Sequence, residues 1–301
     1  MLPRPEYHPR HSGFARKPGI LKYIAFGLET TDAIMTQTPD LMAFTSFEIK
    51  YETAADVPPP YCHYYHIRGR ATAAGLETDF SWTYHNRDDI TQEELEDEGF
   101  TNHDDFQWNG IIDVAWLPPL ETLLSGTRPT GDPSPDDPFL ELDFQQPSGE
   151  GFQGQPDILS EWEFFLQEFI QGIYETSGTE APLRIRYRKI TAETVLSCSV
   201  TLHFANRLVS VQTRKGERDP HDSTEDWDGM KTALQHIYSL DYQPEKAEAQ
   251  EPGQQPGQKG VYLETGENVW YRLGTSARNP SPKTETTGWI EKFFDGLVML
   301  G

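Results

Sequence analysis

The stretch from residue 183 to residue 215 decides the fold of this chain. It reads LRIRYRKI at 183–190, VLSCSVTLH at 195–203 and LVSVQTRK at 208–215. In each run apolar and polar side chains alternate, which is typical of antiparallel strands with one buried side and one solvent-facing side. Three arginines share the polar side of the first run: Arg184, Arg186 and Arg188. The stretch therefore predicts a sheet whose open face carries a row of arginines beside small hydroxyls.

Two segments with helical periodicity lie on either side of this stretch. The segments at 157–176 and 224–240 both repeat apolar residues every three or four positions, which predicts one buried stripe on each helix. Alternating runs also occur between residues 20 and 144. Together these patterns favour the α+β class, with an antiparallel β-sheet core over residues 20–242 and two main amphipathic helices packed on it.

A short helix is predicted just after residue 90. Thr91 and Glu94 have the spacing of a capping box, and Ile90 and Leu95 have the spacing of a hydrophobic staple. Gly99 can end the helix. We expect this helix to be acidic and exposed, and to be held mainly by its staple.

The ends of the chain differ in composition from the core. Residues 1–19 are rich in Pro, Arg and His and predict an extended basic N-terminal arm. Residues 243–260 are rich in Pro, Gln, Glu and Gly, which is the composition of a linker. Residues 261–301 predict a β-hairpin, a second linker and a C-terminal amphipathic helix. We expect the 243–260 linker to tether this last region to the core.

The C-terminal helix has an apolar side with two possible uses. It can fold back on its own domain, or it can dock in a groove of a partner protein. The residues that we expect to contact a partner are Trp289, Ile290, Phe293 and Leu297. Only Lys292 could supply a basic side, which disfavours binding to a membrane surface.

Charge is distributed unevenly along the 301 residues, whose formal net charge is −23. Residues 77–163 carry 22 acids and two bases, whereas residues 183–218 carry eight bases and two acids. A surface this acidic repels phosphate, so nucleic acid is an unlikely partner for the whole molecule. The arginine row is therefore expected to face acidic groups, either in this chain or in a protein partner.

Other features narrow the class of protein. The two cysteines, Cys62 and Cys198, make a disulfide framework unlikely and have no metal-binding spacing. The longest apolar runs fall short of the roughly 18 residues that a membrane span needs, so we expect no membrane insertion. The start of the chain lacks the apolar region of a signal peptide. We expect a soluble, cytoplasmic protein.

Catalytic and metal-binding signals are weak. The sequence has no glycine-rich phosphate loop, no HExxH, no G-x-S-x-G and no CxxC. Four aspartates crowd one predicted loop-to-helix junction, namely Asp219, Asp222, Asp226 and Asp228. Together with His203 they could hold a metal ion, although acids at a helix N-terminus are also expected without a metal. We expect no cofactor.

Three hypotheses about function follow from these patterns. The first is a non-catalytic interaction protein, a subunit or adaptor of a larger assembly, which docks through its termini and its charge-segregated faces. The second is an acidic inhibitor or immunity-like protein that blocks a basic active site with the 77–163 surface, chiefly through acids in 88–105. The third is a metal-dependent hydrolase that uses His203 and the cluster from Asp219 to Asp228.

Overall fold

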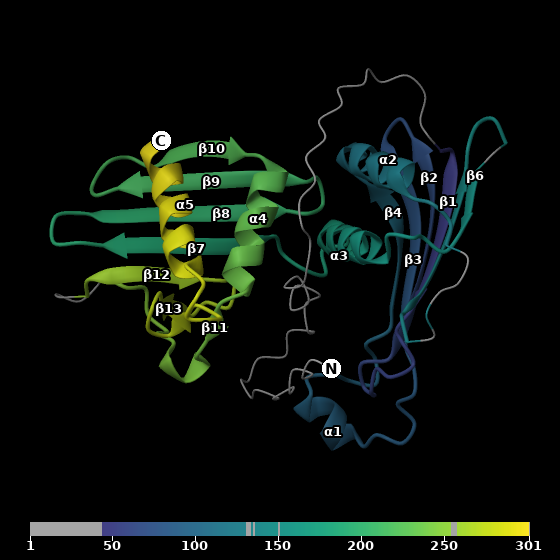
Figure 1. Cartoon of the computed structure of the whole chain (residues 1–301), viewed down its shortest axis with the longest axis horizontal. Helices are drawn as coiled ribbons and strands as arrows, with labels where there is room; N and C mark the ends of the chain where they lie inside the picture. The colour runs from purple at the N-terminus through teal and green to yellow at the C-terminus, as the bar shows by residue number, and fades with distance from the viewer. Residues whose placement is uncertain (1–43, 131–133, 135, 150, 254–257, 301) are drawn as a thin grey trace. The chain divides into compact units, whose positions relative to one another are not determined.

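Two antiparallel β-sheets, each with helices on one face, organise the chain (Figure 1). The computed structural model describes residues 44–130, 134, 136–149, 151–253 and 258–300. The chain divides into two compact units between Gln167 and Glu168. The α+β class is thus confirmed, but the strands form two separate sheets, whereas the sequence predicts one core over 20–242. The predicted arm at 1–19 lies outside the described residues.

The first sheet has six strands in the order β4-β3-β2-β1-β5-β6. In chain order they are β1 Ser46–Glu52, β2 His63–Thr72, β3 Gly75–Tyr84, β4 Phe106–Ile112, β5 Phe139–Gln145 and β6 Gly151–Gly154. A 3₁₀ turn (Val114–Trp116), helix α2 (Leu117–Gly126) and the first part of helix α3 (Leu159–Thr176) pack on one face of this sheet (Figure 1). We call the opposite face the outer face of the first sheet.

Aromatic side chains fill the core of the first unit. The ring of Phe144 stacks on Phe47 at 5.6 Å and meets the indole of Trp162 at 5.8 Å. Trp162 is fully buried, and its Nε1 donates a hydrogen bond of 2.9 Å to Thr127 Oγ1. This bond satisfies the polar atom of a large buried ring, so α3 is held on the sheet both by packing and by a specific contact.

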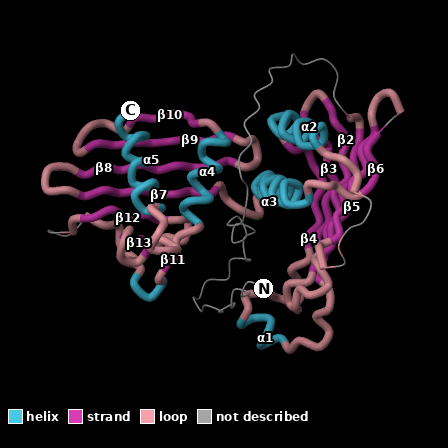
Figure 2. Tube along the Cα trace, viewed as in Figure 1, coloured by secondary structure: helices cyan, strands magenta, loops and turns pink. Residues whose placement is uncertain are grey.

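The second sheet also has six strands, in the order β10-β9-β8-β7-β12-β13. In chain order they are β7 Leu183–Ile190, β8 Val195–His203, β9 Leu208–Lys215, β10 His221–Glu225, β12 Gly260–Glu264 and β13 Trp270–Arg272. Helices α4 (Trp227–Tyr238) and α5 (Thr286–Leu300) lie beside each other across one face (Figures 1 and 2). The short strands β11 (Asp241–Tyr242) and β14 (Ala277–Arg278) pair separately.

The three strands at 183–215 form with the faces that the sequence predicts. Leu183, Ile185 and Tyr187 of β7 are buried, while Arg184 is exposed and Arg186 and Arg188 are half-buried. Strand β8 alternates between buried and half-buried residues along its whole length. The apolar side of both strands therefore faces the helices, and the polar side forms the outer face of the second sheet.

The C-terminal region is part of the second sheet and not a tethered module. Strand β12 pairs antiparallel with β7, with Tyr262 opposite Arg188 and Glu264 opposite Arg186. Part of the predicted linker is also ordered, because Glu248 exchanges two backbone hydrogen bonds of 2.8 Å with Trp270. Pro252 is buried as well. Composition alone did not show this, because backbone pairing does not depend on apolar side chains.

Candidate docking faces

The outer face of the second sheet is a grid of arginines and hydroxyls that the strand register brings together. In antiparallel strands, residues directly opposite each other lie on the same face. Arg184 therefore shares a row with Thr201 and Ser210, Arg186 with Ser199 and Gln212, and Arg188 with Ser197 and Arg214. We call this set the arginine face: Arg184, Arg186, Arg188, Ser197, Ser199, Thr201, Ser210, Gln212 and Arg214.

Arg186 is committed to an internal ion pair. Its Nε lies 2.9 Å from Glu264 Oε2, and the Glu264 side chain is 1% exposed. The other carboxylate oxygen accepts hydrogen bonds from the backbone N–H groups of Gly266 and Asn268. The guanidinium also lies 5.0 Å from the ring centre of Trp270. Arg186 thus ties β7 to β12 and β13, and its charge is compensated within the unit.

Arg188 is covered by the chain's own loop. It forms an ion pair with Glu251, and an added Cβ on Gly253 would lie 3.7 Å from its Nε. Burial, and after it the positive charge of Arg214, lowers the pKa of Arg188. Its Nε is buried without a hydrogen-bond partner among the described residues. The loop at 248–253 therefore places an acid on the arginine face.

Arg184 and Arg214 are the exposed cations of this face. Neither forms an ion pair within the described residues, and Arg214 Nε donates a hydrogen bond to the backbone oxygen of Arg218. Both guanidinium groups lie beside hydroxyl side chains that can add hydrogen bonds to a bound carboxylate. The sequence predicted the row of Arg184, Arg186 and Arg188, but it did not single out Arg214, which alternation alone places on the same side of β9.

The four residues of α5 that the sequence predicts to contact a partner differ in burial. Ile290 and Leu297 are 1% and 8% exposed and are buried within the second unit. Trp289 packs on His236 of α4 at 4.0 Å and stacks on Phe293 at 5.3 Å, and both side chains are half-buried. A partner would reach Ile290 and Leu297 only after α5 had left the sheet.

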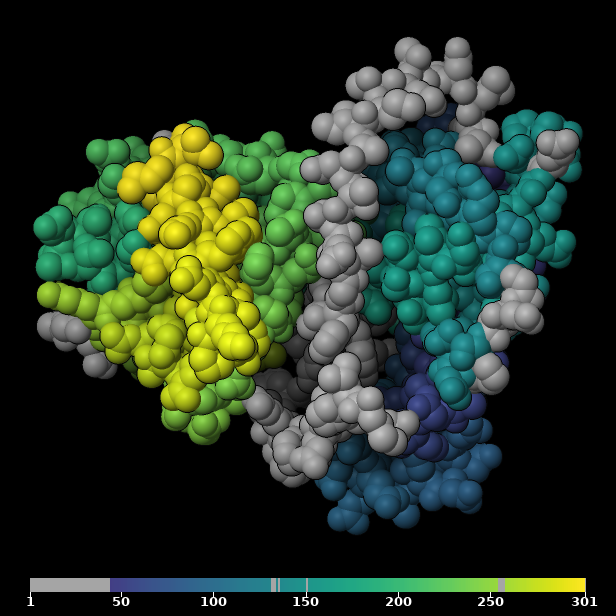
Figure 3. Space-filling view, viewed as in Figure 1, coloured from purple at the N-terminus to yellow at the C-terminus, as the bar shows by residue number. Residues whose placement is uncertain are grey.

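Helix α5 is fastened to β7 by polar contacts as well as by packing. The ring of Phe294 stacks on Tyr187 at 4.7 Å, and Tyr187 Oη donates a hydrogen bond of 2.9 Å to Asp295 Oδ1. Lys189 Nζ forms ion pairs with Glu291 and Asp295. In the space-filling view α5 occupies the surface beside α4 (Figure 3). The structure therefore favours the reading in which this helix folds back on its own domain.

Two of the four aspartates considered as metal ligands make other hydrogen bonds. Asp226 caps α4, where its Oδ2 accepts a hydrogen bond of 2.8 Å from the backbone N–H of Gly229. Asp222 accepts a hydrogen bond from the side chain of Gln212. In the part of the chain that the structure describes, no group of three or more His, Cys, Asp and Glu is arranged to hold a metal ion.

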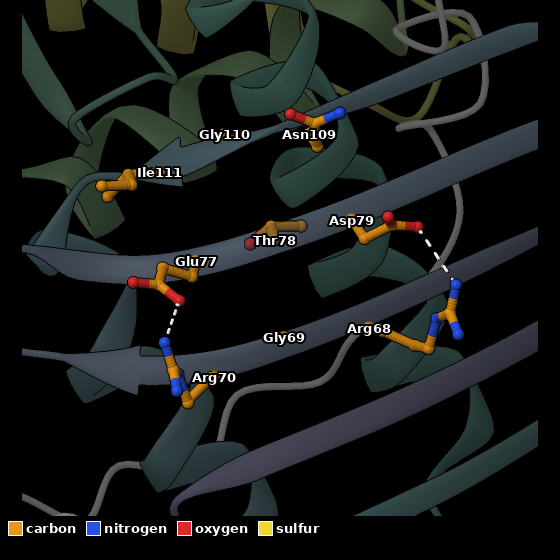
Figure 4. A pocket seen from close by; sticks show the side chains of 9 residues that line it. All are labelled: Arg68, Gly69, Arg70, Glu77, Thr78, Asp79, Asn109, Gly110 and Ile111. Carbon is orange, nitrogen blue, oxygen red and sulfur yellow. Dashed lines mark hydrogen bonds and ion pairs between the residues drawn. The ribbon is translucent and has the colours of Figure 1, made fainter.

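The outer face of the first sheet is built differently. A shallow depression of about 500 Å³ lies over β2, β3 and β4, and Figure 4 shows two ion pairs in it, Arg68 with Asp79 and Arg70 with Glu77. Asn109 and Ile111 of β4 lie along its other side (Figure 4). Opposite charges face each other across the strands, so the depression offers no uncompensated charge to a ligand.

The acidic segment at 86–105 is held in a defined conformation. Helix α1 (Gln92–Asp97) has the predicted capping box between Thr91 and Glu94, and Leu95 is buried. Arg87 pairs with Asp104 at 3.3 Å and lies 3.8 Å from the ring centre of Tyr84 at the end of β3. These contacts hold the segment in place next to the first sheet, so its remaining acids have defined positions.

Comparison with known protein families, with curated protein sequences and with solved structures finds no significant match to this chain. Among the described residues, no helix has the length and apolar character needed to cross a membrane. The geometry and charge of the two outer faces are therefore the features from which a function can be inferred.

Proposed function

We propose that this chain is a non-catalytic interaction protein, a subunit or adaptor that docks through its arginine face onto an acidic surface of a partner protein. The observation that carries this proposal is the exposure of Arg184 and Arg214 among hydroxyls on a sheet face. Exposed cations that are not neutralised by an ion pair add positive potential to a surface, and this potential attracts and orients acidic partners.

The contact between Glu251 and Arg188 supports this choice of ligand. Glu251 comes from a loop distant in sequence and sits on the same face of β7 that carries Arg184. A carboxylate on an irregular segment can therefore reach the arginines of this face. Guanidinium groups bind carboxylates through paired hydrogen bonds, so a partner's acidic segment would use the same chemistry at Arg184 and Arg214.

Aromatic side chains argue against nucleic acid as the ligand of this face. Tyr262 and Trp270 share the face with the arginines, because they lie opposite Arg188 and Glu264 in the register. Both rings are buried, at 2% and 3% exposed. Binding of single-stranded nucleic acid normally adds stacking of bases on exposed rings, and these two rings are not exposed.

The test compares two charge-reversal variants in affinity capture from the source cells. One variant combines Arg184→Glu with Arg214→Glu, and the matched control combines Lys283→Glu with Lys292→Glu, two exposed lysines away from the arginine face. Both changes add the same negative charge. We expect an acidic partner to be captured by the wild-type chain and by the control but lost from the arginine variant.

Equal capture by all three proteins would contradict the proposal, as would capture of nothing but nucleic acid. A deletion of residues 244–301 would be a poorer test than these point substitutions. It would remove β12, β13 and α5, and with them one of the two strands that pair with β7 and part of the cover of the buried face. Point substitutions on exposed side chains avoid this loss of structure.

A second candidate function is favoured by the fixed acidic segment at 86–105. It carries nine acids and one base, and that base, Arg87, is paired with Asp104. An inhibitor or immunity-like protein would use such a surface to cover a basic active site. Neutralising Glu93, Glu96 and Asp97 together should then lower both the affinity for the basic partner and its salt dependence. An unchanged salt dependence would contradict this function.

A further inference from the structure

Two of the exposed large apolar side chains lie on one row of the first sheet, on either side of an acid. Glu52 at the end of β1 lies opposite Tyr64 of β2 and opposite Phe139 of β5. The two aromatic residues are 44% and 42% exposed. We call these three residues the Glu52 row. Single exposed aromatics are ordinary, but a pair flanking a carboxylate is a specific arrangement.

From this arrangement we infer that the Glu52 row binds a lysine or arginine side chain of a basic partner protein. Strands are about 4.8 Å apart, so the Cα atoms of Tyr64 and Phe139 are separated by roughly 10 Å. A cation placed above the carboxylate would lie within reach of both rings, because cation–π attraction extends to about 6 Å from a ring centre. The carboxylate and two rings would together replace the water around the cation.

Glu52 is available for such a ligand. Among the described residues it forms no ion pair with a lysine or an arginine, and its nearest basic group is His85 Nε2 at 3.8 Å. That nitrogen is buried without a hydrogen-bond partner among the described residues. The other acids nearby are engaged, since Glu141 and Glu48 both pair with Lys50. Lys50 is thereby neutralised, so it does not repel a cation that approaches the Glu52 row.

The local charge favours a basic partner. The His85 ring packs against Tyr64, and the acidic segment at 86–105 follows directly in the chain. A net negative field near a binding site raises the rate at which basic partners arrive, and it is screened by salt. The segment would steer the partner, while the rings of the Glu52 row would select the side chain that docks. This inference does not depend on the arginine face.

The test uses fluorescently labelled hexalysine as the probe and the full chain as the receptor, at about 0.15 M salt, where the Debye length is about 8 Å. We expect Tyr64→Leu and Phe139→Leu to weaken binding by about two- to fivefold each, because each removes a ring and no charge. Glu52→Gln should weaken it more. Glu77→Gln removes an acid from the same face and is the matched control, because Glu77 lies six residues along β3 from Thr83, the residue opposite Tyr64.

Hexalysine acetylated on its side chains should not bind, and thermal melts should show that every variant is folded. The combined Glu93, Glu96 and Asp97 neutralisation separates this inference from the second candidate function. If that variant binds weakly but still responds to Tyr64→Leu, both the steering segment and the Glu52 row are supported. If Tyr64→Leu and Phe139→Leu bind hexalysine as the wild type does, or the wild type does not bind it, the inference is overturned.

Discussion

The outer face of the first sheet pairs each lysine and arginine with an acid on a neighbouring strand, whereas the outer face of the second sheet leaves two arginines exposed among hydroxyls. On the first face Lys50 pairs with Glu141, Arg68 with Asp79 and Arg70 with Glu77. On the second face Arg186 and Arg188 are paired, and Arg184 and Arg214 are exposed without an ion pair among the described residues.

The two sheets have the same plan, with six antiparallel strands and helices packed on the inner face. An antiparallel sheet requires an apolar inner face and leaves its outward positions free to vary. The difference between the outer faces is therefore chemical and not architectural. Arg184, Arg214 and Glu52 are charged side chains of these faces without an ion-pair partner among the lysines, arginines and acids that the structure describes, and they are the positions at which we propose binding.

The largest effects are expected on the inner faces, where the two units should respond alike. Phe144→Ala in the first unit and Phe294→Ala in the second each empty a site of 0% exposure. Each should lower the free energy of unfolding by about 3–5 kcal/mol, through lost burial and a residual cavity. Hydrogen exchange followed by mass spectrometry measures this for each sheet. Strands β1 and β5 should lose protection in the first variant, and β7 and β8 in the second.

A contrasting result would be a loss of the same strands' protection in both variants. In that case the sheets would unfold as one cooperative unit, and the comparison of their outer faces would have to be made on binding alone.

The next effect is expected at the buried ion pair of the second sheet. Glu264→Ala removes the partner of Arg186 and the acceptor of two backbone N–H groups. Leaving these groups unpaired at a site where the acid is 1% exposed should cost about 3 kcal/mol. Denaturant unfolding measures the change, and Arg184→Ala is the control from the same strand. A cost below about 1 kcal/mol would show that water replaces the lost carboxylate.

Local patterns predicted much of the second sheet. The alternation at 183–215 identified β7, β8 and β9 and their buried sides, and the apolar stripes identified α3 and α4. The end of β12 lacks alternation, because Tyr262, Leu263 and Glu264 are all buried. Glu264 is covered by its ion pair with Arg186, which is 78 residues away in the chain. A pairing over that distance leaves no local pattern, so the sequence predicts a tethered module where the structure has two strands of the second sheet.

The candidate sites were predictable to different degrees. The row of Arg184, Arg186 and Arg188 follows from alternation within one strand, which needs no knowledge of the neighbours. The acids that pair with two of these arginines come from other segments and were not identified. The Glu52 row requires the register of β2, β1 and β5, which brings residue 139 beside residue 52. Alternation places a side chain on a face but does not say which strand lies next to it.

Opposite pH dependence should distinguish the two units. Burial lowers the pKa of His63 in the first unit to about 4, and burial raises the pKa of Glu175 in the second unit to about 7. For His63 the unfolded chain binds more protons, so the first unit should lose stability as pH falls from about 6.5 to 4. For Glu175 the folded chain binds more protons, so the second unit should lose stability as pH rises from about 4.5 to 7.

Two substitutions check this prediction in exchange experiments at several pH values. Glu175→Gln keeps an acceptor for the backbone N–H of Ala205, which Glu175 Oε2 binds at 3.1 Å. In this variant the second sheet should be more protected from hydrogen exchange than in the wild type above pH 7, and about equally protected near pH 4. His63→Phe keeps a ring against Trp82, which His63 stacks on at 4.1 Å, and should flatten the acid response of the first sheet. If the pH dependence of exchange were the same in the variants as in the wild type, His63 and Glu175 would not be its cause.

The smallest effect is expected at the exposed counterpart of the Arg186–Glu264 pair. Arg70 and Glu77 also join neighbouring strands, but their side chains are 66% and 45% exposed. Water solvates either charge when the other is removed, so Glu77→Ala should change the free energy of unfolding by at most about 1 kcal/mol. The same denaturant measurement used for Glu264→Ala provides the comparison. If Glu77→Ala cost as much free energy of unfolding as Glu264→Ala, an exposed ion pair would stabilise its sheet as strongly as a buried one. The paired charges of the first outer face would then serve stability, and not only neutralise that surface.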